Sequence, residues 1–276
     1  MRRSSAKPPF PFLLLAIALA LASGLCAPRP AMAAGPFADW AAVVVAGDFR
    51  AHSGAPSEAF DNARREVAHS LLAAGFSPDN LRQFSVRPER YPQERLMLSD
   101  AGLVERQLGA LSRQATGGCL VYFTSHGSPA GVVLGPRLLS PAGLARIVDD
   151  ACMGRPTAVI ISACFSGVFV PTMARADRMV LTAARPDRSS FGCGESDRYP
   201  YFDSCVLESL PKAKDFADLG VGVQACVAAK ETATGMAPPS EPQLFLGPQF
   251  RALLPFYGFL RQPQAPPELS HRGATP

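Results

Sequence analysis

Two apolar runs that end in chemically reactive residues constrain this chain more than any other feature. Residues 121–128 read VYFTSHGS and residues 158–167 read AVIISACFSG, so His126 and Cys164 each lie just beyond an apolar stretch. Strands buried on both faces need such runs, and open parallel sheets place ligand sites at the carboxyl ends of their strands. Two neighbouring strands of this kind would bring an imidazole and a thiol to one edge, which predicts a cysteine hydrolase.

The rest of the chain alternates between strand-like and helix-like segments. Apolar or alternating runs predict strands at 40–47, 81–86, 118–124, 156–163, 178–184 and 243–246, and a hairpin at 131–139. Helical spacing and capping residues predict helices at 57–75, 100–114, from Ser140 onward, 204–210 and 215–230. Strands separated by helices predict an α/β fold, a three-layer α/β/α sandwich around a mainly parallel sheet.

The first 33 residues have the pattern of a secretion signal. Three basic residues precede an uncharged apolar stretch at 10–27, and Ala31-Met32-Ala33 is an A-x-A cleavage site. We therefore expect an exported, periplasmic or secreted domain at 34–260. An uncleaved membrane anchor is the alternative, because the apolar stretch reaches the lower end of spanning length. Residues 261–276 are Pro-rich and polar, which predicts a disordered tail.

The charge balance indicates which partners to expect. The first 33 residues hold four of the 27 basic residues and no acidic one, so 27 − 4 = 23 basic residues face 23 acidic residues in the remainder. A neutral chain without a basic stripe argues against nucleic-acid binding. We expect a peptide or protein substrate as the partner, and no stable membrane partner once the signal is cleaved. About 240 residues suit one α/β domain.

The cysteines predict one free thiol beyond the reactive one. Six cysteines remain once Cys26 leaves with the signal, and an oxidising compartment permits disulfides. A catalytic Cys164 would leave five, an odd number, so at least one other thiol stays free or pairs between chains. Cys119 lies inside an apolar strand and is interpreted as a small buried hydrophobe. Cys193 is interpreted either as a disulfide partner of Cys205 or as a residue of a loop beside the cleft.

The histidines give no sign of a metal centre. His52 and His69 are interpreted as residues of the surface or of a helix face. Structural metal sites in proteins have Cys and His ligands at short, regular spacings, and no such cluster occurs here. The sequence therefore predicts neither a metal site nor a cofactor.

Three sequence blocks resemble the legumain family of cysteine peptidases, within the wider caspase-like fold group. They are TSHGS at 124–128, ISACFSG at 161–167 and LTAARPDRSSFGC at 181–193. The 38-residue step from His126 to Cys164 also fits the family. The resemblance covers roughly residues 41–246, and it implies a caspase-like sheet and a Cys-His dyad without a dedicated carboxylate.

The chemistry of such a dyad assigns a role to each residue. Cys164 would be the nucleophile, and the backbone N–H dipoles of a helix-like turn at 165–173 would favour its thiolate. The N–H groups of Gly127 and Cys164 would form an oxyanion hole, and His126 would protonate the leaving amine. Two alternatives share the fold: a transpeptidase or ligase that uses the same dyad, and a binding domain without catalysis.

Residues of the substrate pocket are implied by the resemblance alone. Ser189 and Ser190 match the Ser-Ser segment of the family, and Asp203 falls near its later pocket acid. The chain differs from legumains at Ser162, where they have an acid, and at 53–62, where they have a basic residue before the first helix. We expect a pocket that prefers an amide side chain, then a basic one, then an acidic one. In the alternative interpretation, Asp203 caps a helix that begins near residue 204.

Overall fold

The computed structural model describes residues 35–260. The predicted signal and the predicted disordered tail lie outside the described residues. Within this described range, every helix is too short or too polar to cross a membrane.

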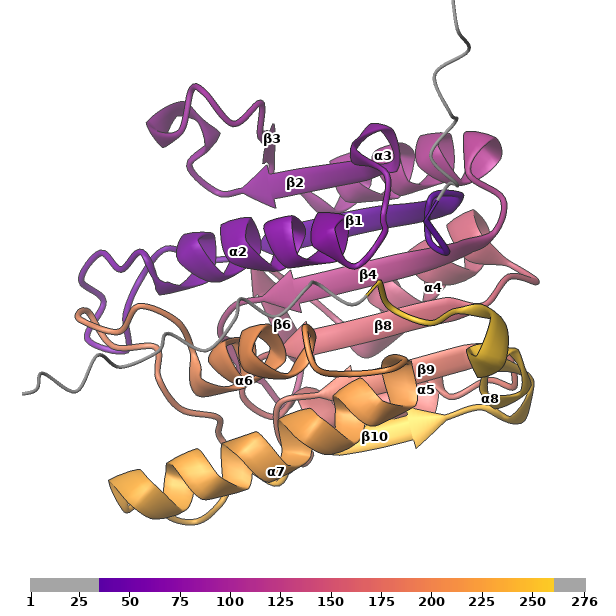
Figure 1. The fold of residues 1–276 in the computed structure, drawn as a ribbon. Helices are drawn as coiled ribbons and strands as arrows, with labels where there is room; N and C mark the ends of the chain where they lie inside the picture. The colour runs from indigo at the N-terminus through magenta and orange to yellow at the C-terminus, as the bar shows by residue number, and fades with distance from the viewer. Residues whose placement is uncertain (1–34, 261–276) are drawn as a thin grey trace, which may run out of the picture. The chain divides into compact units, whose positions relative to one another are not determined.

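A seven-stranded sheet forms the centre of the domain (Figure 1). Its strands lie in the order β10-β9-β8-β4-β1-β2-β3, and all neighbours are parallel except β10, which runs antiparallel to β9. The strands are β1 (Trp40–Ala46), β2 (Leu81–Ser85), β3 (Met97–Leu98), β4 (Gly118–Thr124), β8 (Thr157–Ser162), β9 (Arg178–Thr182) and β10 (Gln243–Leu246). The predicted mainly parallel α/β fold is confirmed.

Helices cover both faces of the sheet (Figure 1). One face packs against α2 (Ala59–Ala73), α6 (Tyr201–Ser209), α7 (Phe216–Thr234) and α8 (Pro248–Leu253). The other packs against α3 (Ala101–Gln114), α4 (Pro141–Cys152) and α5 (Val170–Met173). A small sheet follows β4, with strands β5 (Gly127–Ser128), β6 (Gly131–Leu134) and β7 (Arg137–Leu139). Single 3₁₀ turns occur at η1 (Pro78–Asn80), η2 (Pro88–Arg90), η3 (Ser166–Phe169) and η4 (Leu254–Phe256).

The central strands are buried on both faces, and their side chains alternate between two cores. In β1, Trp40, Ala42 and Val44 belong to the core under α2, α6 and α7. Their neighbours Ala41 and Val43 belong to the core under α3 and α4. Because successive side chains of a strand point to opposite faces, a strand between two helical layers must be apolar throughout. This is why the run that ends at His126 is uninterrupted.

Side-chain caps begin helices α3, α4 and α7, and two helix boundaries differ from the prediction by three or four residues. The Asp100 carboxylate accepts from the Leu103 N–H at the start of α3, and the Ser140 hydroxyl accepts from the Gly143 N–H at the start of α4. Helix α6 begins at Tyr201, three residues earlier than predicted, directly after Pro200. Helix α7 continues to Thr234, where Gly235 adopts a left-handed conformation and ends it.

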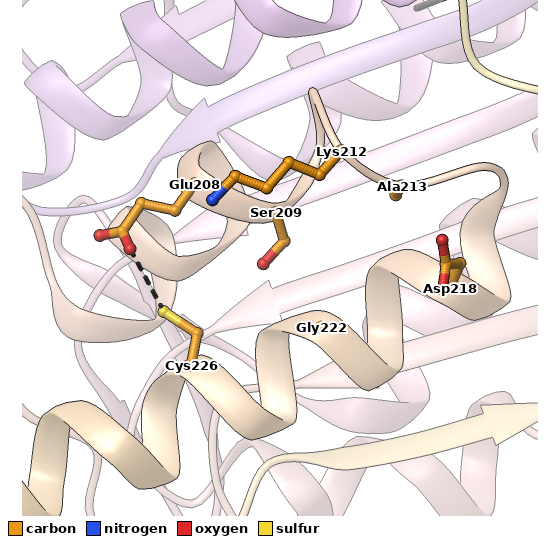
Figure 2. A pocket seen from close by; sticks show the side chains of 7 residues that line it. All are labelled: Glu208, Ser209, Lys212, Ala213, Asp218, Gly222 and Cys226. Atoms are coloured by element: carbon orange, nitrogen blue, oxygen red, sulfur yellow. Dashed lines mark hydrogen bonds between the residues drawn. The ribbon is translucent and has the colours of Figure 1, made fainter.

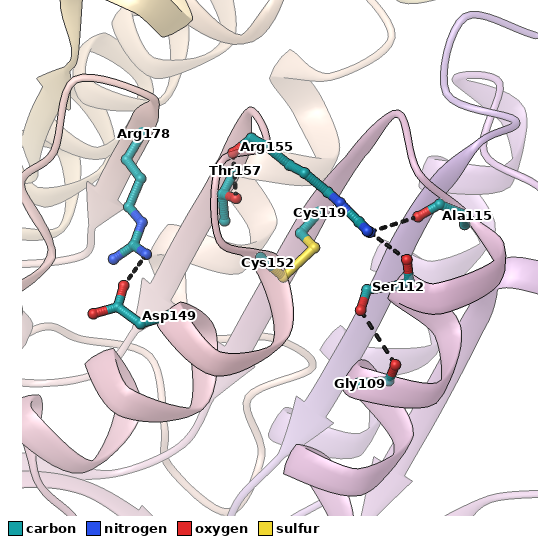
Figure 3. The surroundings of a disulfide bond; sticks show 9 residues. All are labelled: Gly109, Ser112, Ala115, Cys119, Asp149, Cys152, Arg155, Thr157 and Arg178. Atoms are coloured by element: carbon teal, nitrogen blue, oxygen red, sulfur yellow. Dashed lines mark hydrogen bonds and ion pairs between the residues drawn. A yellow bond between two sulfur atoms is a disulfide. The ribbon is translucent and has the colours of Figure 1, made fainter.

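Two disulfides connect elements of the domain. Cys119, at the start of β4, pairs with Cys152 at the end of α4 (Figure 3). Cys205 of α6 pairs with Cys226 of α7. The interpretation of Cys119 as a packing residue and the pairing of Cys193 with Cys205 are therefore wrong. Both partners of each real pair lie on the same face of the sheet, and the sequence spacing does not reveal which faces α4 and α7 cover.

Candidate active site

The two reactive segments meet at the carboxyl edge of the sheet. Strands β4 and β8 are parallel neighbours whose last residues, Thr124 and Ser162, lie side by side. The Ser125 N–H donates to the Ser162 carbonyl at 3.0 Å, which extends the pairing by one step. His126 and Cys164 each follow two residues after the paired ends. The predicted juxtaposition of the two strand ends is therefore present.

The turn after Cys164 explains the residues of its motif. Phe165 has a left-handed backbone (φ 59°), which is uncommon for a residue other than glycine, and its N–H donates to the Arg188 carbonyl at 2.8 Å. The Ser166 hydroxyl accepts from the Ala184 N–H at 3.2 Å. A Cβ on Gly167 would lie 2.6 Å from the backbone nitrogen of Pro186, so only glycine fits there. The Ser-Gly pair thus fixes the turn against the segment after β9.

The Cys164 thiol is 6% exposed and lies against Ser190. The Ser190 N–H donates to Sγ at 3.3 Å, and the Ser190 hydroxyl lies 3.7 Å from the same atom. The thiol in turn donates to the Ser190 carbonyl oxygen, which lies 3.5 Å from Sγ. The loop after β9 therefore holds the Cys164 side chain in place, and the structure brings Ser190 to the thiol. Ser189, its neighbour, is exposed to solvent.

A backbone carbonyl orients the His126 ring. Nε2 of His126 lies 2.8 Å from the carbonyl oxygen of Arg50, in the segment after β1. A carbonyl only accepts, so Nε2 carries a hydrogen, and the neutral ring has its lone pair on Nδ1. The ring lies nearly perpendicular to the ring of Phe60 of α2, with 5.0 Å between the ring centres. No sequence signal identifies the Arg50 carbonyl, because the interaction uses the backbone and not the side chain.

The turn that presents this carbonyl depends on Asp48. Its carboxylate accepts from the N–H of Phe49 at 2.6 Å and from the N–H of Arg50 at 3.1 Å. Such an Asx-type turn holds a local backbone conformation that has no strand or helix to support it. Asp48 is thus a residue that positions His126 through Arg50, and it was not identified from the sequence.

Gly127 lies directly against the nucleophile. A Cβ at this position would lie 2.2 Å from the Cys164 carbonyl oxygen and 2.9 Å from Cβ of Ala163. A residue with any side chain would push the two strand ends apart. The backbones of Gly127 and Cys164, to which the sequence assigns the oxyanion hole, therefore lie next to each other. Their action on a substrate oxygen stays a prediction.

Asp203 lies buried beneath both strand ends. Its carboxylate accepts hydrogen bonds from the hydroxyls of Tyr122 at 2.5 Å, Thr124 at 3.0 Å and Ser162 at 2.6 Å. The side chain is fully buried, and loss of water raises the pKa of this carboxyl to about 6 although the three hydroxyls oppose the shift. Because Pro200 is at the N-cap of α6, the capping interpretation is wrong. The predicted contact of Asp203 with substrate stays a prediction.

Two loops lie together over this edge of the sheet. They are the β1–α2 loop (residues 47–58) and the β9–α6 loop (residues 183–200). Ser53 donates to the carboxylate of Glu195 at 2.6 Å, and Ser57 donates to the carbonyl of Gly194 at 3.1 Å. These bonds join segments that are more than 130 residues apart in sequence.

The same loops bring a second thiol to the site. Sγ of Cys193 lies 3.7 Å from Nδ1 of His52, and the rings of His52 and His126 are 5.5 Å apart. Burial, together with the nearby Cys164, raises the pKa of the Cys193 thiol to about 11, so it is protonated at neutral pH. Among the described residues, Cys193 forms no disulfide. Its position agrees with the alternative interpretation of Cys193 as a residue of a loop beside the cleft.

The fold brings together three side chains that could bind a metal ion. One ligand atom from each of His52, His126 and Cys193 lies within 4.8 Å of the other two. The prediction of no metal site depended on sequence spacing. The three residues come from three separate segments, so their spacing along the chain could not reveal the cluster.

The domain has several cavities, and one of them is lined by the segment that orients His126. A cavity of about 300 Å³ between α6 and α7 has no active-site residue in its wall (Figure 2). Asp48, Phe49 and Arg50 line a second cavity of about 250 Å³. This second cavity shares Gly135 and other wall residues with a third, of about 500 Å³, that contains Leu138. A groove therefore starts beside the segment that orients His126.

The fold and the order of the strands have a caspase-like architecture. The structure is similar to caspase-1 from Spodoptera frugiperda, with a TM-score of 0.55 and 17% sequence identity, over 79% of this chain and 92% of that one. Residues 89–221 match the model of the peptidase C13 family. A search of curated proteins finds no match. The family match supports a cysteine-type peptidase, which is a hydrolase, and the structural match shows a caspase-like fold. The matched segment contains His126 and Cys164.

Proposed function

We propose that this protein is an exported cysteine endopeptidase that cleaves peptide bonds through Cys164 and His126. The observation that carries the proposal is the arrangement of the two strand ends. The Arg50 carbonyl fixes the hydrogen of His126 on Nε2, and the Ser190 N–H donates to the Cys164 thiol. A nucleophile and a base that are each held by a further group are the arrangement that covalent catalysis needs.

The reaction follows from the positions of the protons. Nδ1 of His126 takes the thiol proton, and the Arg50 carbonyl stabilises the imidazolium through Nε2–H. Sγ attacks the peptide carbonyl carbon, and the N–H groups of Gly127 and Cys164 hold the oxyanion. His126 then returns its proton to the leaving amine, and a thioester remains on Cys164. Water attacks the thioester, gives a proton to His126, and releases the new carboxyl end and the thiol.

The pocket for the residue before the cleaved bond would lie between Ser189, Ser190 and the floor above Asp203. Ser190 flanks the thiol, and the hydroxyl of Ser162 separates Asp203 from the strand edge. An amide side chain of the substrate could replace one of the three hydroxyls as a donor to the Asp203 carboxylate, without adding charge. An acidic side chain would meet an ionised Asp203 at neutral pH, so the amide is expected first and the acid last.

Export is supported by the disulfides. Cys119–Cys152 and Cys205–Cys226 lie within one domain, and such pairs persist in oxidising compartments. Removal of the signal predicts that the mature protein begins at Ala34. Intact mass of the protein recovered from its native compartment tests this. A protein that keeps residues 1–33 and fractionates with membranes would support the anchor instead.

A cleavage profile of the purified mature domain on a peptide library tests the activity. The wild type should release fragments from inside peptides, and Cys164→Ala should not. An alkylating peptide probe should label Cys164 and leave Cys193 free. Labelling at Cys193 alone would contradict the assignment. An added amine nucleophile that diverts most product into new peptide bonds would favour the ligase alternative.

A further inference from the structure

We propose that His52, His126 and Cys193 bind one Zn²⁺ ion, and that this ion reversibly blocks the peptidase. The blocking effect depends on the function proposed above for His126, whereas the metal site itself does not. Three segments supply the ligands: the β1–α2 loop, the end of β4 and the β9–α6 loop.

The distances suit a tetrahedral ion. Zinc lies about 2.0–2.1 Å from a histidine nitrogen and about 2.3 Å from a cysteine sulfur, so the two ligand atoms of a tetrahedral N–Zn–S edge are about 3.6 Å apart. Sγ of Cys193 and Nδ1 of His52 are already 3.7 Å apart. All three ligand atoms lie within 4.8 Å of one another, so a small inward movement of the two loops completes the set.

The hydrogen bond of His126 prepares it as a ligand. Histidines that bind metals commonly donate their other ring N–H to a backbone carbonyl or a carboxylate, which fixes the lone pair on the metal side. Nε2 of His126 has this partner in the Arg50 carbonyl. The same bond that prepares Nδ1 for proton transfer therefore prepares it for zinc.

The ligand types select the metal. Two imidazoles and one thiolate suit zinc, whereas hard ions such as Mg²⁺ and Ca²⁺ require oxygen ligands. Three protein ligands leave the fourth position open, unlike the closed four-ligand sites that stabilise folds. His52 is exposed and Cys193 is partly exposed, so the ion has a path from solvent. These features indicate an ion that exchanges, not one that the fold requires.

Binding of zinc would stop the reaction at its first step. The ion takes the lone pair of His126 that would accept the thiol proton, and it displaces the proton of Cys193 into solvent. No oxidation or reduction occurs, and a chelator restores the original groups. Zinc would also tie together the β1–α2 and β9–α6 loops, which supply His52 and Cys193.

Direct metal binding tests the site without any peptidase assay. We would titrate Zn²⁺ and Co²⁺ into the mature domain carrying Cys164→Ala, which removes the other thiol of the site. The expected results are one bound ion and a Co²⁺ spectrum with tetrahedral visible bands and a thiolate-to-cobalt charge-transfer band. Adding His52→Ala or Cys193→Ala should weaken zinc binding by at least about 100-fold. Adding His69→Ala, an exposed histidine of α2 outside the cluster, should leave it unchanged.

A Co²⁺ spectrum without the thiolate band, or equal zinc affinity in the His52→Ala, Cys193→Ala and His69→Ala proteins, would overturn the site. Thermal unfolding of each protein checks that the fold is kept, and Cys193→Ser gives a second variant at the thiol. The switch is then tested with Cys164 present, each rate being compared with the same protein in chelator. Zinc should inhibit the wild type and the His69→Ala variant at concentrations at least about 100-fold lower than it inhibits Cys193→Ala. Zinc that binds without slowing cleavage would overturn the switch. A protein that binds zinc but never cleaves, even in chelator, would overturn the proposed function and the switch together, and its binding would still support the site.

Discussion

The strand ends and the loops above them hold the same site in different ways. Below, Asp203 is fully buried and accepts from three hydroxyls on β4 and β8. Above, the β1–α2 and β9–α6 loops meet through bonds such as that of Ser53 to Glu195, whose side chains are exposed. Hydrogen bonds to a buried charge contribute about 1.5–3 kcal/mol each, whereas exposed ones contribute little. The chemistry therefore depends on a rigid base, and access to it depends on a weakly held cover.

The largest effect should come from the nucleophile at the strand end. Cys164→Ala removes the sulfur that forms the acyl-enzyme, so peptide cleavage should fall at least about 1,000-fold. The melting temperature should change little, because a small residue replaces a small one. Cys193→Ala, the matched control from the loops, removes a thiol whose pKa is raised to about 11 and should keep labelling of Cys164 by an alkylating probe. Cleavage that survives Cys164→Ala would show that the strand end is not the reactive centre.

The burial of Asp203, beneath the strand ends, should make the stability of the protein depend on pH. The carboxyl of Asp203 has a folded-state pKa of about 6, above the ordinary value of about 4. Between these values the folded state holds a proton that the unfolded state releases. The free energy of unfolding contributed by Asp203 is therefore complete below about pH 4 and falls by about 3 kcal/mol as the pH rises to about 6. Chemical denaturation of wild type and Asp203→Asn across this range measures it, and parallel curves would contradict the buried, shifted carboxyl.

Substrate preference distinguishes a structural role of Asp203 from a role in substrate recognition. Asp203→Ala leaves the hydroxyls of Tyr122, Thr124 and Ser162 without their acceptor, which should cost about 3 kcal/mol of stability. If Asp203 also contacts substrate, kcat/KM should fall about ten- to a hundredfold for substrates ending in asparagine, and by less for arginine and aspartate. Equal loss on all three substrates, with a lower melting temperature, would leave Asp203 a supporting role only.

Sequence patterns predict the strand ends but not the loops above them. The apolar runs of β4 and β8 must be buried on both faces, and their parallel pairing then brings the segments that carry His126 and Cys164 to one edge of the sheet. Strand β4 occupies the predicted residues 118–124, because local pattern and tertiary burial agree there. The glycines at 127 and 167 are likewise explained by backbone contacts that only glycine permits.

The loops carry no comparable signal. The Arg50 carbonyl is a backbone group, so any residue type could supply it, and only the fold shows that it faces His126. His52 and Cys193 are 141 residues apart and meet because two unrelated loops lie over one strand end. The disulfide of Cys119 was missed for the same reason, because its partner depends on which face of the sheet α4 covers. Spacing rules identify contacts within one segment and miss contacts between segments that are far apart in the sequence.

A middle-sized effect should come from the turn that links the loops to the base. Asp48→Ala removes the acceptor of the Phe49 and Arg50 N–H groups, which lets the Arg50 carbonyl move away from His126. We expect kcat to fall about tenfold, as for the loss of one hydrogen bond of about 1–1.5 kcal/mol. Asp48→Asn keeps an accepting oxygen and should retain most of the activity. A similar loss in both variants would show that the charge of Asp48, and not the turn, is what His126 requires.

The smallest effect should come from the exposed contact between the two loops. Glu195→Ala removes the acceptor of Ser53, whereas Glu195→Gln keeps an oxygen in its place. An exposed bond contributes about 0.5 kcal/mol, so a looser β9–α6 loop should raise KM about twofold and leave kcat and the melting temperature nearly unchanged. Ser189 and Ser190 belong to this loop, so part of the substrate binding energy would then be used to order them. Steady-state kinetics on one peptide compares the three proteins, and the Gln variant should match the wild type. A fall in kcat at constant KM would instead mean that the loop contact positions the reacting groups, and the contrast between a rigid base and a weakly held cover would be wrong.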